Sequence, residues 1–226
     1  MKDFTKFIPS ESDEIKNYIN TIFNHPLIEE KWIVPSKREF ECYDGGTIDF
    51  REENIELSVQ GVAYLTKKLL KYKPKRIMEV GMNAGSFSII CKLVLGDVKI
   101  YTIDRMVEFE ERVKQINDFF GENLITFYQG DSNSQEFRNW ITQFRPYDLA
   151  WIDGNHSTEF VTYDIHTAII SDIPMIWCDD YGKDLFTDVY DVVHNMVDGG
   201  LLSFIENSNL IGDVGSIAIL QNNRAK

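Results

Sequence analysis

From about residue 56 onward, apolar residues follow two alternating spacings. Short runs of apolar residues predict buried strands, and apolar positions at helical spacing predict the helices between them. The predicted strands are 76–80, 98–103, 124–128, 147–152 and 174–178, and the predicted helices are 59–72, 86–95, 108–120, 134–144, 158–170 and 185–196. Two more predicted strands, 201–205 and 216–220, have only a polar loop between them.

Strands that alternate with helices form a mostly parallel sheet with helices on both faces. The expected fold class is α/β: a Rossmann-like, doubly wound, mostly parallel sheet of seven strands that ends in an antiparallel hairpin. We assign residues 56–226 to this domain.

Residues 1–55 show a different pattern. Glu11–Phe23 has a weak helical spacing with Ser10 as its expected N-cap, and residues 40–50 resemble a hairpin around Asp44-Gly45-Gly46. We expect a small N-terminal cap over one edge of the main domain rather than an independent domain. Such a cap could exchange between subunits, which leaves a homo-oligomer open.

Composition narrows the class of partner. The chain has 226 residues and a net charge of −13, which disfavours nucleic acid because phosphate binding depends on Lys and Arg. No run of about 18 apolar residues suggests a membrane span. The three cysteines have no C-x-x-C spacing and the first ten residues have no apolar leader, so we expect a cytoplasmic protein without a membrane partner.

Acidic residues follow nearly every predicted strand. In an open α/β sheet, ligands bind beyond the carboxyl ends of the strands. The acids at these positions are Glu79, Asp104, Asp131, Asp153, Asp179 and Asp180. The placement of these acids predicts a binding site along the carboxyl-terminal edge of the sheet.

A glycine loop follows the first strand of the domain. Gly81 and Gly85 allow a tight turn and a close approach to a ligand, and the helix from Ser86 directs free N–H groups at it. Asn83 and Ser86 stand where a dinucleotide fingerprint needs its second and third glycines, so the loop fits a pyrophosphate poorly.

Asp104 lies about twenty residues beyond the loop, a position suited to hydrogen bonding two ribose hydroxyls. An acid at the same position also binds the ribose in nicotinamide-dependent enzymes. Asp104 therefore indicates a nucleoside ligand but does not identify the cofactor. Asp131 could contact an adenine amino group or cap the helix that follows it.

Several segments resemble class I S-adenosylmethionine-dependent methyltransferases. E-x-G-x-x-x-G at 79–85 is similar to their motif I, and Ser58-Val-Gln60-Gly61 to the helix start before their first strand. I-D-G-x-H at 152–156 with D-D-Y at 179–181 is similar to the cation-dependent small-molecule O-methyltransferases, a group that includes catechol O-methyltransferase. The resemblance covers roughly residues 56–221 and implies S-adenosylmethionine as cofactor.

The resemblance implies residue roles. Cofactor-binding residues would be Glu79, Gly81, Asn83, Gly85, Ser86, Asp104, Asp131 and Asp153. Asp153, Asp179 and Asp180 would hold Mg²⁺, and oxygen ligands without clustered His or Cys favour such hard cations. His156, with Asp153, would be catalytic, because an imidazole can take a proton from a hydroxyl near neutral pH.

Other features limit this interpretation. Ser171–Met175 lacks the Gly-Gly that the family has before its fifth strand, so that turn must be built differently. Trp151 and Trp177 are expected to pack on the sheet, and His25, His166 and His194 to serve packing or lie at the surface.

The leading expectation is O-methylation of a small-molecule hydroxyl. The alternatives are a metal-independent methyltransferase acting on nitrogen or oxygen, a nicotinamide-dependent oxidoreductase, and a non-catalytic cofactor-binding module. No sequence feature identifies the methyl acceptor. Sugar hydroxyls, phenols and other small alcohols all stay possible acceptors.

Overall fold

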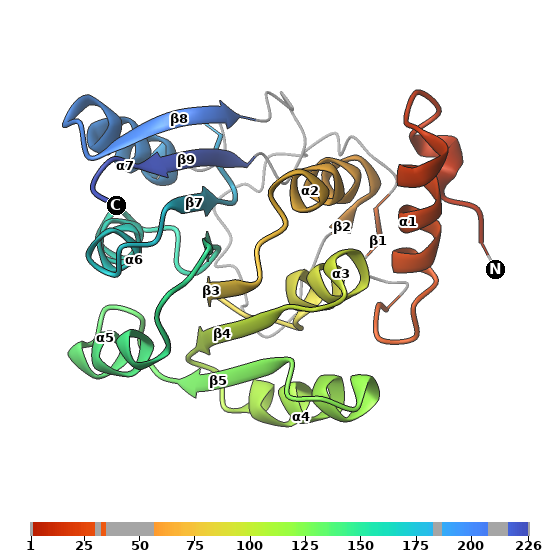
Figure 1. Cartoon of the computed structure of the whole chain (residues 1–226), viewed down its shortest axis with the longest axis horizontal. Helices are drawn as coiled ribbons and strands as arrows, with labels where there is room; N and C mark the ends of the chain where they lie inside the picture. Colours follow the sequence, from red (N-terminus) through yellow and green to blue (C-terminus); the bar gives the residue numbers. More distant parts are fainter. Residues whose placement is uncertain (1, 30–32, 35–56, 183–186, 208–216, 226) are drawn as a thin grey trace, which may run out of the picture.

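The computed structural model describes residues 2–29, 33–34, 57–182, 187–207 and 217–225. Its main sheet has seven strands in the order β5-β4-β3-β6-β7-β9-β8 (Figure 1). The strands are β3 Arg76–Val80, β4 Lys99–Asp104, β5 Ile125–Gln129, β6 Leu149–Ile152, β7 Met175–Cys178, β8 Leu202–Asn207 and β9 Ala218–Asn222. Strands β3 to β7 pair in parallel, and β9 pairs antiparallel with β7 and β8. The expected fold class is confirmed.

Helices cover both faces of this sheet. Their bounds are α2 Val59–Tyr72, α3 Ser86–Leu95, α4 Glu108–Phe120, α5 Gln135–Ile141, α6 Thr158–Ile170 and α7 Thr187–Asp198. One apolar core joins α2, α3 and α4 to the sheet, and a second joins α5, α6 and α7 to its other face. Trp151 and Trp177 are buried in the first core, as expected.

The N-terminal segment shares the first core. Helix α1, Asp13–Phe23, buries Ile15, Ile19 and Ile22 against α2 and α3, and Figure 1 shows it beside them. Its N-cap is Ser12, whose Oγ accepts the Ile15 N–H at 3.3 Å, so the expectation of Ser10 is wrong. Because the helix starts at Asp13, the Ser10 hydroxyl lies too early in the chain to reach the free N–H groups of the first turn.

A short parallel pair joins β1, Ile33–Val34, to β2, Leu57–Ser58. The predicted hairpin at 40–50 lies outside the described residues. No described helix is long and apolar enough to cross a bilayer.

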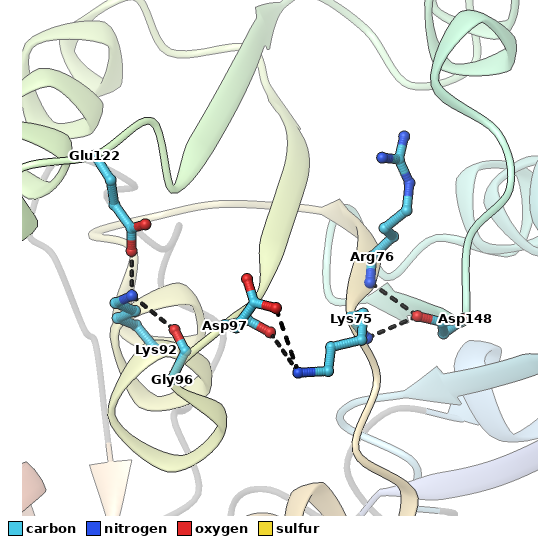
Figure 2. A network of polar contacts seen from close by, with 7 residues as sticks. All are labelled: Lys75, Arg76, Lys92, Gly96, Asp97, Glu122 and Asp148. Carbon is cyan, nitrogen blue, oxygen red and sulfur yellow. Dashed lines mark hydrogen bonds and ion pairs between the residues drawn. The ribbon is translucent and has the colours of Figure 1, made fainter.

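The amino-terminal edge of the sheet is held by polar contacts (Figure 2). The Asp148 carboxylate accepts the backbone N–H groups of Lys75 at 2.7 Å and Arg76 at 2.9 Å, which ties the starts of β3 and β6 together. Lys92 at the end of α3 forms an ion pair with Glu122, which precedes β5. The binding site expected from the sequence lies at the opposite edge.

That opposite edge has one point where the chain connections diverge. From β3 the chain continues to β4 on one side, and from β6 it continues to β7 on the other, while β3 and β6 are neighbours. In doubly wound sheets a ligand binds at such a point. The residues after β3 and β6 therefore lie where a ligand is expected.

Candidate active site

The glycine loop after β3 is pressed against the end of β6. Gly81 has φ +86°, and a Cβ on it would lie 2.0 Å from the Asp153 carbonyl oxygen. Gly85, with φ +77°, precedes α3, and a Cβ there would lie 2.6 Å from Ile116 Cδ1. Only glycine combines this backbone conformation with this space. Gly81 thus brings motif I into direct contact with the I-D-G segment, and Gly85 lets the start of α3 pack against Ile116 of α4.

Asp104 at the end of β4 holds the glycine loop in place. Its Oδ2 accepts the N–H groups of Met82 and Asn83, both at 3.1 Å, and its Oδ1 accepts the Met106 N–H at 3.1 Å. Asn83 is exposed and has φ +47°. A carboxylate has about four acceptor sites, so ribose contacts by Asp104 remain open. They stay a prediction.

Glu79 lies beneath the loop instead of on its surface. It is fully buried, and its Oε2 accepts a hydrogen bond from the Ser88 hydroxyl of α3 at 3.0 Å. Burial raises the pKa of Glu79 to about 8, and the charges of Asp153 and Asp104 act in the same direction. Glu79 therefore supports the loop from the interior, while Ser86 is half-buried at the start of α3.

Asp131, the expected adenine contact, is exposed after β5 and forms an ion pair with Arg105 at 3.6 Å. The next helix is capped by a different residue: the Ser134 hydroxyl accepts the Phe137 N–H at 3.1 Å. The Asp131 carboxylate is thus not needed as a cap. Its role toward adenine stays a prediction.

Three side chains meet at the carboxyl ends of β6 and β7. His156 Nε2 lies 3.2 Å from Asp180 Oδ2 and 3.8 Å from Asp153 Oδ1. Each of the three residues offers one ligand atom, and the three atoms lie within 4.8 Å of one another. We call Asp153, His156 and Asp180 the rim group. Among the described residues, it is a set of side chains that could hold a metal ion.

The electrostatics of the rim group are those of crowded acids. Burial raises the pKa of Asp153, and it raises that of Asp180 to about 7 with a further contribution from the Asp153 charge. Burial lowers the pKa of His156, but its contacts with the two carboxylates outweigh burial and leave that pKa raised. Positive charge at this place therefore stabilises the group.

Asp179, expected as a metal ligand, does not belong to the rim group. Its Oδ1 is buried without a hydrogen-bond partner, and burial with the neighbouring Asp153 and Asp180 charges raises its pKa well above the usual value. The next residue, Asp180, has φ +53°, a conformation that L-residues adopt rarely.

The turn before β7 lacks the Gly-Gly of the family. Asp172 takes φ +56° at this turn, so an aspartate adopts the left-handed conformation that glycine favours. The remaining histidines lie away from the rim group. His25 stacks on Phe120, His194 hydrogen-bonds the Tyr181 hydroxyl at 2.8 Å, and His166 is exposed on α6.

Two residues near the site escaped the sequence analysis. Arg112 on α4 donates from Nε to the carbonyl oxygen of Ala84 in the glycine loop at 3.0 Å and from Nη2 to that of Leu27 at 2.6 Å. Asp164 is a fully buried carboxylate on α6, and burial raises its pKa to about 7. The sequence signal that could have identified Asp164 is its position as a single acid between Val161 and Ala168 on the apolar face of α6.

The comparison with protein families agrees with this geometry. Residues 78–181, from β3 to just past the rim group, match the family described as "Methyltransferase domain". The chain contains a methyltransferase domain. Enzymes of this class depend on S-adenosylmethionine, so the expected enzyme class is confirmed and the nicotinamide alternative is set aside.

Solved structures share the fold of this methyltransferase. An O-methyltransferase of Bacillus cereus, solved with S-adenosylhomocysteine, has a TM-score of 0.58 at 11% identity, over 96% of this chain and 94% of its own. TomG, an O-methyltransferase of Streptomyces achromogenes solved with S-adenosylmethionine, has 0.55 at 15% identity, over 97% and 94%. The S-adenosylhomocysteine-bound methyltransferase PaMTH1 of Podospora anserina has 0.58 at 13% identity, over 73% and 78%. At these identities the likeness concerns the fold.

Proposed function

We propose that this methyltransferase transfers the methyl group of S-adenosylmethionine to a hydroxyl oxygen of a small molecule, assisted by a divalent cation. The observation that carries the proposal is the rim group, which lies beside the glycine loop at the point where the chain connections diverge. The fold shared with two O-methyltransferases supports the same reaction class.

The residues present fit a divalent cation. Asp153, His156 and Asp180 offer three ligand atoms within 4.8 Å of one another. The unpartnered Asp179 Oδ1 adds a further acidic oxygen in the same neighbourhood. Crowded carboxylates repel one another, and a cation between them relieves that repulsion. A bound divalent cation supplies acidity to a substrate hydroxyl and fixes its position.

The chain's own residues would then position the two reactants. The glycine loop, held by Asp104, would bind the methionine part of the cofactor, and Asp104 and Asp131 would bind its nucleoside. The rim carboxylates would orient the acceptor hydroxyl in line with the methyl group. The hydroxyl oxygen bonds to the methyl carbon, the carbon–sulfur bond breaks, sulfur keeps the electron pair, and the hydroxyl proton leaves to a base.

A second candidate is metal-independent transfer with His156 as the base. The 3.2 Å contact between His156 Nε2 and Asp180 Oδ2 favours this possibility, because a carboxylate can orient an imidazole and raise its basicity. The acceptor and the expected cytoplasmic location stay predictions, and either candidate is compatible with sugars, phenols and other small alcohols.

Two measurements on the full chain test the proposed function. We expect calorimetry to show binding of S-adenosylhomocysteine, and we expect transfer of a labelled methyl group to a panel of small alcohols, phenols and sugars. A chelator should abolish this transfer, and Mg²⁺ or Mn²⁺ should restore it. Asp153→Asn should lose the activity, whereas the exposed Asp172→Asn serves as the matched control.

Failure to bind S-adenosylhomocysteine would overturn the whole proposal. Full activity in the chelator would instead favour the metal-independent candidate.

A further inference from the structure

The rim group contains an imidazole where a hard-cation site would have only oxygen. His156 follows Asp153 by three residues, on the connection between β6 and α6. Its Nε2 faces the carboxylates of both Asp180 and Asp153, at 3.2 and 3.8 Å. Neighbouring ligands of an ion with bonds of about 2.1 Å lie roughly 3 Å apart. The imidazole nitrogen is therefore placed as a ligand of the same ion as the two carboxylates.

We propose that His156 is a cation ligand and that the rim group prefers a first-row transition cation such as Mn²⁺ to Mg²⁺ or Ca²⁺. The inference rests on the proposed function and deepens it. Mg²⁺ and Ca²⁺ take oxygen ligands and Mn²⁺ also binds carboxylates, whereas imidazole suits Zn²⁺, Fe and other first-row transition cations. One nitrogen and two carboxylate oxygens therefore favour the transition cation.

The same geometry separates His156 from the role of general base. An imidazole nitrogen that coordinates a cation uses its lone pair in that bond and cannot also accept a proton from the acceptor hydroxyl. The base role given to His156 by the sequence interpretation thus competes with its place in the rim group. A protonated imidazole could instead neutralise Asp153 and Asp180 without any cation, and the experiment must separate these cases.

The experiment uses the full chain with S-adenosylhomocysteine present. Mn²⁺ is titrated by electron paramagnetic resonance, and Mg²⁺ is added as a competitor to obtain the affinity ratio. Electron spin echo modulation of bound Mn²⁺ then reports whether a ¹⁴N nucleus is coordinated. We expect Mn²⁺ to bind more tightly than Mg²⁺ and the ¹⁴N modulation of a bound imidazole to be present.

Two variants locate the nitrogen. His156→Asp leaves three carboxylates, so it should lose the ¹⁴N modulation and lower the Mn²⁺ to Mg²⁺ affinity ratio at least about tenfold, since even residues that only orient a ligand change metal affinity by about 10–100-fold. His166→Asp carries the same substitution at an exposed position on α6 outside the rim group and should behave like the wild type. The wild-type modulation gives an answer even if His156→Asp does not fold.

The outcomes distinguish the two proposals. Mn²⁺ bound without ¹⁴N modulation, or with affinity no higher than that of Mg²⁺, would overturn the role of His156 and leave cation-assisted transfer standing. Absence of any cation binding in a protein that binds S-adenosylhomocysteine would remove cation assistance itself, and the role of His156 with it.

Discussion

The missing side chain of Gly81 determines how closely the glycine loop approaches the end of β6. The residue has φ +86°, and its Cα lies against the backbone of Asp153 and Gly154. A Cβ at this place would meet backbone atoms, which cannot rotate away as a flexible side chain can. The loop and the end of β6 must therefore separate to accommodate any other residue.

Gly81→Ala should lower both stability and cofactor affinity. The left-handed conformation alone costs about 1–2 kcal/mol for a residue with a Cβ, and the backbone overlap adds to it. We expect a loss of at least about 2 kcal/mol in the free energy of unfolding, measured by denaturant titration. S-adenosylhomocysteine binding should weaken in calorimetry.

Gly121→Ala is the matched control. Gly121 follows α4 with φ +66°, and a Cβ there would meet nothing within 4 Å. It should show only the conformational cost, with cofactor affinity unchanged. Equal effects of the two substitutions would contradict the close approach that we assign to Gly81.

Backbone conformation also sets the limit of what the sequence could predict about single residues. Asp172 and Asp180 both have positive φ, which aspartate adopts more often than most residues, but the sequence does not tell which of its aspartates do so. The positive φ of Asp180 accompanies a rim group that includes His156 and leaves out Asp179. A list of acids at strand ends therefore points to one edge of the sheet, whereas the way these side chains group there depends on backbone turns that the list does not contain.

At the scale of elements, prediction succeeded where burial determines the pattern. The bounds of α2, α3, α4, α6 and β3 were predicted to the residue, because each is a periodic or continuous apolar run between polar turns. The other strand ends shifted by one or two residues, except the carboxyl ends of β6 and β7, which were exact. Contacts between elements distant in sequence, such as that of Arg112 with Leu27 and Ala84, leave no pattern in the chain.

Arg112 links three elements: α4, the glycine loop and the segment after α1. Arg112→Ala removes the hydrogen bonds to Ala84 and Leu27. We expect a loss of roughly 1 kcal/mol in the binding of S-adenosylhomocysteine, about fivefold in affinity, because the carbonyl of the loop loses a charged donor. Calorimetry at fixed pH and salt measures this change.

Lys114→Ala provides the control on the same helix, since Lys114 is exposed on α4. It should leave the affinity unchanged. If Arg112→Ala lowered the melting temperature and kept full affinity for S-adenosylhomocysteine, Arg112 would anchor α4 without positioning the glycine loop.

At the scale of the whole molecule, the 36 acidic residues outnumber the 23 lysines and arginines, which gives the chain its formal net charge of −13. Among the described acids, Glu79 and Asp164 are fully buried. Burial raises the pKa of Glu79 to about 8 and that of Asp164 to about 7. Ionising these two buried carboxyl groups as the pH rises therefore lowers the stability of the folded protein.

Glu79 should make the protein less stable at pH 8 than at pH 5. Its pKa in the folded state, about 8, lies above the value of 4.5 expected when unfolded. Between these values the folded state binds more protons, so stability is fully present below about pH 4.5 and is lost as the pH rises toward 8. Each unit of raised pKa corresponds to about 1.4 kcal/mol. Glu79→Gln, neutral at every pH, should flatten this slope in urea titrations with a chelator present.

Glu206→Gln is the control, because it removes an acid that stays ionised over the pH range of the experiment. Glu206 on β8 accepts hydrogen bonds from Lys71 at 2.9 Å and Tyr72 at 2.7 Å on α2, and its pKa is lowered to about 2. Burial opposes this shift, and the hydrogen bonds from the lysines and the tyrosine outweigh it. Its contribution is lost only as the pH falls below about 4.5. Glu206→Gln should therefore lower stability equally from pH 5 to 8 and keep the wild-type slope. A flattened slope in this variant, or an unchanged slope in Glu79→Gln, would show that Glu79 is not the group that titrates.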